Sequence, residues 1–247
     1  MKSILITGCN RGLGLGLIKC LVKDINSPKN IIATCRNKSK AQELNDIAAQ
    51  NKNVHILELD VTNTNTFDSF ACEIEKIVAD NGLNVLFNNA GYSPKSTRIN
   101  AVKTEQMMET YAVNVVGPLM LTKVLLPLLK RAADVNQNQT FGSSRSAVIN
   151  MSSVLGSIGL NDIGGVYPYR CSKAAINMAT KSLSIDLKKD GILVACIHPG
   201  WVKTDMGGSN APMDVETSAT GMIQIIRNLS ETHNGGFYQW DGKQLEW

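Results

Sequence analysis

The chain has 247 residues, 43% of them apolar, which is enough to bury a full core within one α/β domain. Its 25 Lys and Arg residues against 21 Asp and Glu residues give a net charge of +4, and the charges are scattered instead of forming the run typical of nucleic-acid binding. The 6 cysteines stand singly, without the spacing of a metal site, and are expected to be reduced thiols. We therefore predict one domain over residues 1–247 that binds neither nucleic acid nor a metal.

Neither end of the chain nor its middle suggests a membrane segment. The apolar run in MKSILITGCN is too short for a signal peptide and passes directly into glycines. The densest apolar run, residues 112–129, is interrupted by Asn114, Gly117, Pro118 and Lys123. The expected location is the cytoplasm, with no membrane partner.

Short β-rich runs alternate with longer helix-like segments. The runs cover residues 3–7, 30–35, 54–59, 84–89, 146–151 and 192–198, and a short run at 235–240 is expected to add an edge strand. Parallel strands need crossover connections of a dozen or more residues, so the alternation predicts a doubly wound, mostly parallel sheet of six to seven strands with helices on both faces. Ligands bind such sheets outside the carboxyl ends of the strands, so the residues after each run are the candidate site.

The first run is followed by a glycine-rich turn, TGCNRGLGLG, and then by a helical pattern. Gly8, Gly12 and Gly14 would let the backbone pass close to a pyrophosphate at the positive end of the helix. Plain turns and methyltransferases carry similar glycines, but the strand before the turn and the helix after it favour a bound nucleotide.

The second run ends in Cys35, Arg36 and Asn37, where an enzyme that uses NAD usually carries an acid for the ribose hydroxyl. The nearest upstream acid, Asp24, falls inside the first helix. Arg36 and Arg11 offer two forked cations suited to a phosphate, which favours NADP(H). The alternative is that both are ordinary solvated arginines.

The stretch VYPYRCSK contains two tyrosines and one lysine. Residues four apart share a helix face, so Tyr169 can meet Lys173, whereas Tyr167 is six residues away and is expected to line a loop. A lysine cation nearby would lower the pKa of the tyrosine toward physiological pH and make it a usable acid or base. Tyr169 is therefore the candidate for chemistry.

The fifth run ends at Ser152 and Ser153, where a hydroxyl could hold a carbonyl oxygen. No histidine is placed to make either serine a nucleophile, since His55 begins the third run, His198 ends the sixth and His233 is near the end of the chain. A hydrolase triad is not expected.

Together these residues resemble the classical short-chain dehydrogenases/reductases, a family with a single Rossmann-type domain. The family's turn T-G-x-x-x-G-x-G matches Thr7 to Gly14, its N-N-A-G matches Asn88 to Gly91, and its Y-x-x-x-K matches Tyr169 to Lys173. The residues in four segments are similar to those of the sniffer-like carbonyl reductases, which are NADPH enzymes that act on aldehydes, ketones and quinones. The segments are TGCNRGLGLG, TCRN, NMSSVLGSI and YPYRCSK.

The resemblance implies a role for each matching residue. Tyr169 would protonate the substrate oxygen, Ser153 would hold it, and Lys173 would tune the tyrosine and bind the nicotinamide ribose. Asn114 would support a water that relays protons to solvent. The residues implied in binding NADP(H) are Gly8, Asn10, Arg11, Gly12, Leu13, Gly14, Arg36, Asp60, Val61, Asn89, Ala90, Gly91, Tyr169, Lys173, Pro199, Gly200, Val202 and Thr204.

One departure from the family concerns the distance between the serine and the tyrosine. Ser153 lies sixteen residues before Tyr169, a few more than usual, with the extra length in GSIGLNDIGGV. The choice between Ser152 and Ser153 stays open, although alignment on the strand favours Ser153. Residues 92–100, 154–168 and 201–213 are expected to line a pocket for a small carbonyl substrate, whose identity the sequence does not give.

The expected function is NADPH-dependent reduction of a carbonyl compound. An NAD-linked alcohol or hydroxysteroid dehydrogenase is the alternative enzyme, and Arg36 argues against it. A non-catalytic, dinucleotide-binding regulatory protein is the alternative from another class, and the intact Ser, Tyr and Lys set argues against that. The resemblance also implies a homodimer or homotetramer built on residues 112–130 and 166–188, where the stripe Ala175, Met178, Ala179 and Leu183 could face a partner or simply the sheet.

Overall fold

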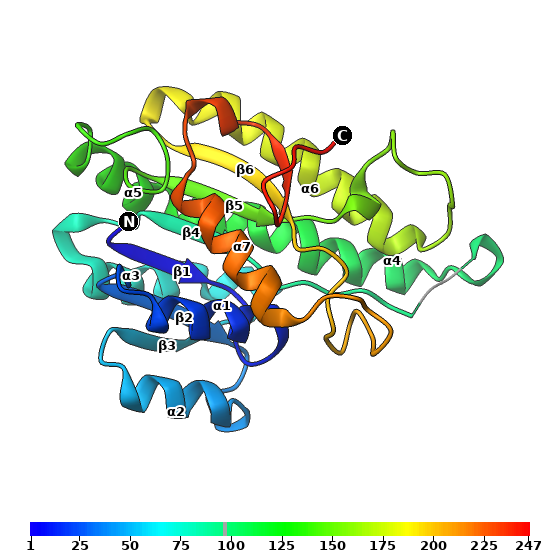
Figure 1. The fold of residues 1–247 in the computed structure, drawn as a ribbon, viewed down its shortest axis with the longest axis horizontal. Helices are drawn as coiled ribbons and strands as arrows, with labels where there is room; N and C mark the ends of the chain where they lie inside the picture. The colour runs from blue at the N-terminus through cyan, green and yellow to red at the C-terminus, as the bar shows by residue number, and fades with distance from the viewer. Residues whose placement is uncertain (96–97) are drawn as a thin grey trace.

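A seven-stranded sheet runs through the centre of the computed structural model, which describes residues 1–95 and 98–247 (Figure 1). The strands are β1 (Ser3–Ile6), β2 (Asn30–Cys35), β3 (Val54–Glu58), β4 (Val85–Asn88), β5 (Ala147–Met151), β6 (Leu193–His198) and β7 (Phe237–Gln239). Their order is β3-β2-β1-β4-β5-β6-β7, and every neighbouring pair is parallel. The predicted doubly wound, Rossmann-type sheet is confirmed, with β7 as the edge strand.

Helices cover both faces of the sheet. One face carries α1 (Gly12–Lys23), α2 (Gln42–Gln50) and α7 (Val215–Arg227), and the other carries α3 (Phe67–Val78), α5 (Gly117–Val135) and α6 (Tyr167–Asp186). The short helix α4 (Thr104–Tyr111) joins α5 through a π-helical turn, Ala112–Val116. Single 3₁₀ turns lie at Lys38–Lys40, Thr64–Thr66, Ala79–Asn81, Ile99–Ala101, Val154–Gly156, Lys188–Asp190 and Glu231–His233.

The apolar runs of the sequence become strands because both of their faces are covered. In β1, Ile4 and Ile6 enter the core beneath α1 and α7, whereas Leu5 enters the opposite core against α3 and α5. Alternate residues of a strand point to opposite faces, so a strand buried on both sides needs an unbroken apolar run. The order of the strands reverses between β1 and β4, which opens a crevice at their carboxyl ends.

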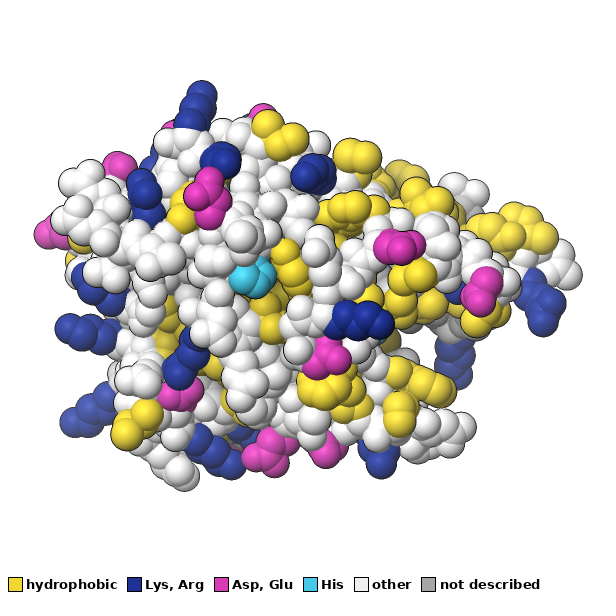
Figure 2. All heavy atoms as spheres, turned by 45° about the horizontal axis from the view of Figure 1, so that its top comes forward, with side chains coloured by type: hydrophobic (Ala, Val, Ile, Leu, Met, Phe, Trp, Pro, Cys, Tyr) yellow, Lys and Arg dark blue, Asp and Glu magenta, His cyan; other side chains and the backbone are white. Residues whose placement is uncertain are grey.

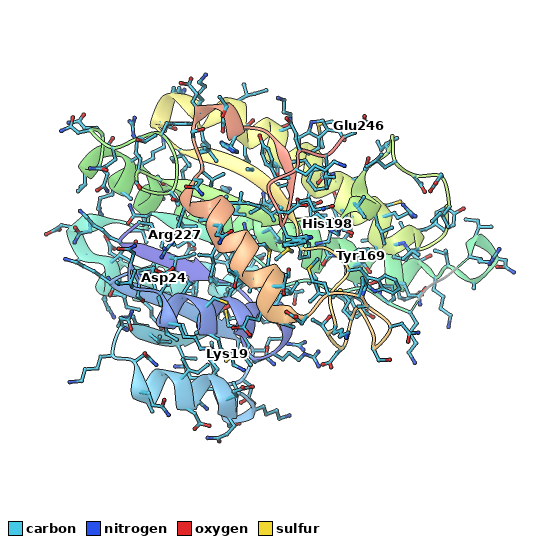
Figure 3. The ribbon with its side chains drawn as sticks, in the orientation of Figure 1. Lys19, Asp24, Tyr169, His198, Arg227 and Glu246 are labelled. Carbon is cyan, nitrogen blue, oxygen red and sulfur yellow. The ribbon has the colours of Figure 1, made fainter. Side chains whose placement is uncertain are left out.

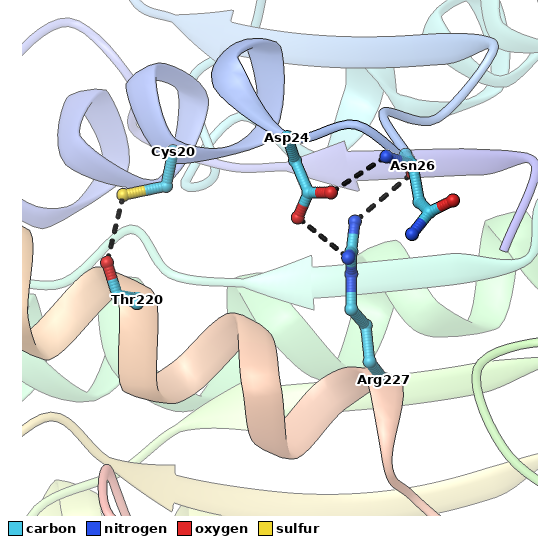
Figure 4. A network of polar contacts seen from close by, with 5 residues as sticks. All are labelled: Cys20, Asp24, Asn26, Thr220 and Arg227. Atoms are coloured by element: carbon cyan, nitrogen blue, oxygen red, sulfur yellow. Dashed lines mark hydrogen bonds and ion pairs between the residues drawn. The ribbon is translucent and has the colours of Figure 1, made fainter.

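Helices α1 and α7 are clamped together along their length (Figure 4). The Arg227 guanidinium lies 2.7 Å from the Asp24 carboxylate and donates to the carbonyl oxygen of Asn26 over 3.1 Å. One turn earlier in α1, the sulfur of Cys20 lies 3.6 Å from the hydroxyl oxygen of Thr220. Because α1 follows the glycine turn and α7 follows the segment after β6, this clamp fixes two walls of the crevice relative to each other.

Helix α6 faces the sheet with polar side chains. The Lys173 ammonium donates to the carbonyl oxygen of Met151 over 2.7 Å, and the Thr180 hydroxyl accepts from the side chain of Asn150 over 2.8 Å. Of the predicted apolar stripe, Leu183 packs against the core on this face of the sheet, whereas Met178 is 68% exposed. Contact with the sheet therefore does not explain Met178.

One continuous helical run, residues 104–135, is long and apolar enough to cross a membrane by those two criteria alone. Half of its most apolar window is buried inside the fold. The core helix of a water-soluble protein meets the same two criteria, so the run is weak evidence for a membrane span. Within residues 1–95 and 98–247, no three His, Cys, Asp or Glu side chains lie together in a group that could hold a metal ion.

Candidate active site

The glycine turn is tied to the end of β4 by a side chain on each. The Thr7 hydroxyl accepts from the backbone N–H groups of Asn89 and Ala90, over 3.0 and 2.9 Å. The Asn89 side chain in turn donates to the carbonyl oxygen of Thr7 over 2.7 Å. These bonds hold the turn and the N-N-A-G segment at one side of the crevice.

The turn has the shape of a phosphate cradle. Gly8 and Gly12 have φ values of +72° and +55°, which residues with a Cβ rarely adopt. At Gly14, a Cβ would fall on the carbonyl oxygen of Gly8 and within 2.8 Å of the Asn89 side-chain nitrogen. Among the described residues, no side chain caps the first turn of α1 and no acid lies in that turn, so its N–H groups suit an anion. Asn10 is exposed and Leu13 is half-buried beside them.

The two candidate phosphate-binding arginines have different surroundings. Arg11 is exposed, and its Nη1 atom lies 2.7 Å from the Asp205 carboxylate in the segment after β6. Arg36 is also exposed, at the end of β2. The pKa of the Asp60 carboxyl lies below its ordinary value because the backbone N–H of Thr62 donates to it, and the positive charge of Arg36 adds to the effect. Arg36 therefore acts electrostatically toward the end of β3.

The residues after β3 and β6 complete the walls of the crevice. Val61 follows Asp60, and its carbonyl oxygen lies against Gly117 at the start of α5. After β6, the carbonyl oxygen of Pro199 accepts from the Ser218 hydroxyl over 2.6 Å, and Gly200 has a φ of +85°.

The segment after Gly200 reaches back to the glycine turn. Val202 is buried and forms a bridge to Met213. A Cβ on Gly12 would lie 3.6 Å from the methyl carbon of Thr204. The predicted cofactor-binding residues of this segment therefore lie beside those of the turn.

Tyr169, which Figure 3 labels, lies beside Lys173 and Ser153. Ser153 follows the carboxyl end of β5, and the other two residues lie in α6. The Lys173 ammonium nitrogen lies 5.4 Å from the centre of the Tyr169 ring. Burial raises the pKa of Tyr169 to about 12, and the nearby Ser153 hydroxyl offsets part of that rise. Burial also lowers the pKa of Lys173 to about 8. The expected lowering of the tyrosine pKa is therefore not seen, because burial outweighs the favourable contacts.

The two serines after β5 point to different partners. The Ser152 hydroxyl donates to the Asn177 side-chain oxygen over 2.5 Å, inside the contact between α6 and the sheet. The Ser153 hydroxyl accepts from the backbone N–H of Leu155 over 3.2 Å, and it lies close enough to Tyr169 to lower the pKa of the phenol. Of the two serines, Ser153 is therefore the one that acts on the tyrosine.

Asn114 lies in the π-helical turn between α4 and α5, a feature often found at functional sites. Its side-chain nitrogen donates to the carbonyl oxygen of Tyr92 and to the Ser172 hydroxyl, over 2.8 and 3.0 Å. Its side-chain oxygen accepts from the backbone N–H of Tyr92 over 2.8 Å. A Cβ on Gly91 would lie 3.5 Å from that oxygen and 3.9 Å from the Lys173 nitrogen. Asn114 thus links the segment after β4 to helix α6.

Sequence reasoning missed three polar residues of this region. Ser172 and Asn177 hold α6 in place, and the pattern of the helix alone gives no sign of their partners on other elements. His198 was considered only as part of a hydrolase triad. It is buried at the end of β6, where burial lowers its pKa to about 4, and its Nδ1 atom has no hydrogen-bond partner among the described atoms.

Tyr167 is not in a loop, as the sequence suggested, but is the first residue of α6. Its side chain is 37% exposed. Of the segments expected to line the substrate pocket, residues 96 and 97 lie outside the described residues. A cavity of about 480 Å³ lies between α1 and the start of α7, lined by residues that include Arg11, Gly12 and Thr204.

Comparison with known proteins gives consistent matches over the chain. A sequence model of the family described as "short chain dehydrogenase" matches residues 2–214. The carbonyl reductase Sniffer of D. melanogaster is 54% identical, with 100% of both chains covered and a TM-score of 0.99. The NADPH-bound carbonyl reductase from chicken fatty liver is 39% identical, with 100% of this chain and 99% of that chain covered and a TM-score of 0.94. An uncharacterized oxidoreductase of Schizosaccharomyces pombe is 34% identical over 97% of this chain and 95% of its own.

Proposed function

The chain belongs to the short-chain dehydrogenase family of oxidoreductases, and on that premise we propose that it reduces a carbonyl compound with NADPH. The observation that carries the proposal is the meeting of Ser153, Tyr169 and Lys173 beside a glycine turn shaped for a phosphate. The likeness to the Sniffer carbonyl reductase and to the NADPH-bound carbonyl reductase of chicken supports both the reaction and the cofactor.

The phosphate groups of the cofactor would be held at two places along the crevice. Gly8, Gly12 and Gly14 leave room for its pyrophosphate over the first turn of α1. Arg36 and Arg11 are the cations for the 2′-phosphate, and no acid follows β2 to accept from a free ribose hydroxyl. This arrangement favours NADPH over the alternative of an NAD-linked dehydrogenase.

When bound, NADPH supplies the hydride that reduces the carbonyl carbon. Tyr169 donates the proton that the carbonyl oxygen needs and is left as a phenolate, which takes a proton back from solvent. Its pKa of about 12 keeps the phenol protonated at neutral pH, as a proton donor requires. Lys173, still mainly a cation at pH 7 with a pKa of about 8, stabilises the phenolate, and its nitrogen lies 5.4 Å from the centre of the Tyr169 ring.

Ser153 and Asn114 have supporting parts in the proposal. The Ser153 hydroxyl, which lies beside the Tyr169 phenol, can donate to the substrate oxygen and hold it at the phenol. Both amide hydrogens of Asn114 are taken by Tyr92 and Ser172, so in the proton relay it acts through its side-chain or backbone oxygen.

The test is the pair of variants Tyr169→Phe and Tyr167→Phe, assayed by loss of NADPH absorbance with a panel of quinones, aldehydes and ketones. Tyr169→Phe removes the proton donor and keeps the ring, so the rate should fall roughly 10² to 10⁴-fold while NADPH binding survives. Tyr167→Phe, on the exposed first residue of α6, should keep nearly full activity. Equal losses in the two variants, or full activity in Tyr169→Phe, would contradict the assignment.

We also propose that the protein forms a homodimer or homotetramer through the outer face of α6. Met178 and Ile185, seven residues apart on that face, are 68% and 66% exposed. Residues seven apart share a helix face, so the two side chains present one apolar strip that a partner could cover. Light scattering at low protein concentration tests this, and a clean monomer mass would remove the idea.

A further inference from the structure

The turn after β2, residues 36–40, carries three exposed cations, Arg36, Lys38 and Lys40. Elsewhere the charges are mixed: on the face drawn in Figure 2, Lys and Arg side chains are interspersed with Asp and Glu side chains. A surface of mixed charge has little preference among anions, so selection of a 2′-phosphate depends on how single cations are held. The hydrogen bonds that fix this turn therefore bear on the choice of cofactor.

Arg36 is bracketed by two hydrogen bonds to the end of β3. Cys35, the residue before it, accepts through its carbonyl oxygen from the backbone N–H of Leu59 over 2.9 Å. Lys38, two residues after it, donates its backbone N–H to the Glu58 carboxylate over 2.7 Å. Glu58 and Leu59 are neighbours in the chain, so one point on β3 fixes the backbone on both sides of Arg36.

The rest of the turn is held by side-chain amides. The Asn37 side-chain oxygen accepts from the backbone N–H of Ser39 over 2.8 Å and from its hydroxyl over 2.6 Å. From α2, the Asn45 side chain donates to the carbonyl oxygen of Lys38 over 2.8 Å. Among the described side chains that hydrogen-bond to the backbone of this turn, Glu58 is the only acid.

The charge of Glu58 is unfavourable for a phosphate nearby. Its register partner on β2 is Cys35, and the negative charge of Glu58 adds to the effect of burial in raising the pKa of that thiol. If charge alone decided its effect, removal of Glu58 would strengthen the binding of a 2′-phosphate at Arg36. Its hydrogen bond acts in the opposite direction, because a side chain on a fixed backbone loses less entropy when it binds.

We propose that Glu58 is a positioning residue that holds Arg36 for the 2′-phosphate of NADPH. This rests on the proposed use of NADPH and names a residue on β3 that sets the preference over NADH. Its role is indirect, since the carboxylate accepts from the Lys38 backbone and thereby sets the course of the chain at Arg36. The hydrogen bond outweighs the repulsion between carboxylate and phosphate, because charge interactions between exposed groups are weak and screened by salt.

The experiment measures the affinity of two ligands that differ only in the 2′-phosphate, adenosine 2′,5′-bisphosphate and AMP, by titration calorimetry. Glu58→Ala should weaken binding of the bisphosphate by about three- to tenfold and leave AMP within about twofold. Glu58→Gln keeps an acceptor for the Lys38 N–H, so both ligands should stay within about twofold of wild type. Glu73→Ala, which removes an exposed acid from α3, is the control for charge alone and should change neither affinity. Titration with NADPH and NADH should give the same difference.

Two results in Glu58→Ala would overturn the proposal. Equal weakening of both ligands would show a general loss of structure, and tighter binding of the bisphosphate would show that the charge of Glu58 decides. Glu58→Ala in an Arg36→Ala background completes the double-mutant cycle. Removal of Glu58 should then change the affinity for the bisphosphate by less than about twofold, because the side chain that it positions is gone. An undiminished loss in that background would also overturn the proposal.

Binding of these two ligands needs no turnover, so it is independent of the proposed reduction. If NADPH reduces no carbonyl compound but Glu58→Ala still weakens only the bisphosphate, the proposed reaction fails and the role of Glu58 stands. If Arg36→Ala does not weaken the bisphosphate, the cofactor assignment fails and the role of Glu58 fails with it. If Arg36→Ala weakens only the bisphosphate but Glu58→Ala weakens neither ligand, the role of Glu58 alone is refuted.

Discussion

Replacement of Arg36 by Ala tests whether this side chain binds the 2′-phosphate of NADPH. Arg36 stands at the end of β2, and its charge already acts on the Asp60 carboxyl at the end of β3. Arg11 is the second cation, but its guanidinium is paired with Asp205 at 2.7 Å. Within residues 1–95 and 98–247, Arg36 has no ion-pair partner, so a 2′-phosphate could bind it directly. For Arg11 the phosphate would have to compete with Asp205.

The size of each effect follows from those surroundings. A charge-assisted hydrogen bond contributes about 1.5 to 3 kcal/mol, or roughly 10- to 150-fold in affinity. Because Arg36 is exposed, we expect the lower part of that range for Arg36→Ala, about 10- to 30-fold weaker NADPH binding. An exposed ion pair contributes at most about 1 kcal/mol, so Asp205→Asn, which frees Arg11, should strengthen NADPH binding by up to about fivefold.

The assay is a fluorescence titration with NADPH and NADH, followed by kcat/KM with each cofactor. NADH has no 2′-phosphate, so its affinity should be nearly unchanged in every variant. Lys29→Ala is the matched control, because it removes one exposed positive charge at the other end of β2. An unchanged NADPH/NADH ratio in Arg36→Ala, or a wild-type preference for NADH, would refute the reasoning.

Two further predictions concern the glycine turn and a buried histidine. Gly14→Ala should lower the free energy of unfolding by about 1 to 3 kcal/mol and weaken cofactor binding, because the added Cβ would collide with the Gly8 carbonyl oxygen. Urea unfolding measures the change, and an unchanged free energy of unfolding would contradict the close approach in the turn. Burial holds the pKa of His198 at about 4 against an ordinary 6.5, so the unfolded chain binds the extra proton as pH falls between these values and the fold loses stability. The free energy of unfolding should therefore fall between pH 7 and pH 4, and His198→Asn should reduce this fall by up to about 3 kcal/mol. Urea unfolding at pH 7 and at pH 4 measures the fall, and an equal fall in wild type and variant would contradict the prediction.

The strands could be predicted to within about two residues at each end, and β2 matches its run, 30–35, at both ends. The reason is that both faces of this sheet are covered, so each strand is an unbroken apolar run between polar connections. The meeting of Tyr169 and Lys173 could be predicted for an equally local reason, since residues four apart share a helix face.

What the sequence could not give depends on contacts between distant residues. Thr7 and Asn89, which join the glycine turn to β4, are 82 residues apart in the chain. Ser152 and Asn177 are 25 residues apart, and their hydrogen bond helps to distinguish Ser152 from the neighbouring Ser153. The pKa of Tyr169 was predicted in the wrong direction because the sequence shows a nearby cation but not the depth of burial.

Helix α6 shows why the polar side of a helix can be its buried side. Lys173, Asn177 and Thr180 repeat at intervals of four and three, so they share one face, and all three are buried against the sheet. The carbonyl oxygen of Met151 at the end of β5 and the buried Asn150 side chain need hydrogen-bond partners, and this face supplies them. Hydrogen bonds are directional whereas apolar packing is not, so the polar face fixes both the rotation and the axial position of α6. The same helix carries Tyr169, and the position of its phenol relative to Ser153 is therefore set by bonds made one to three turns further along α6.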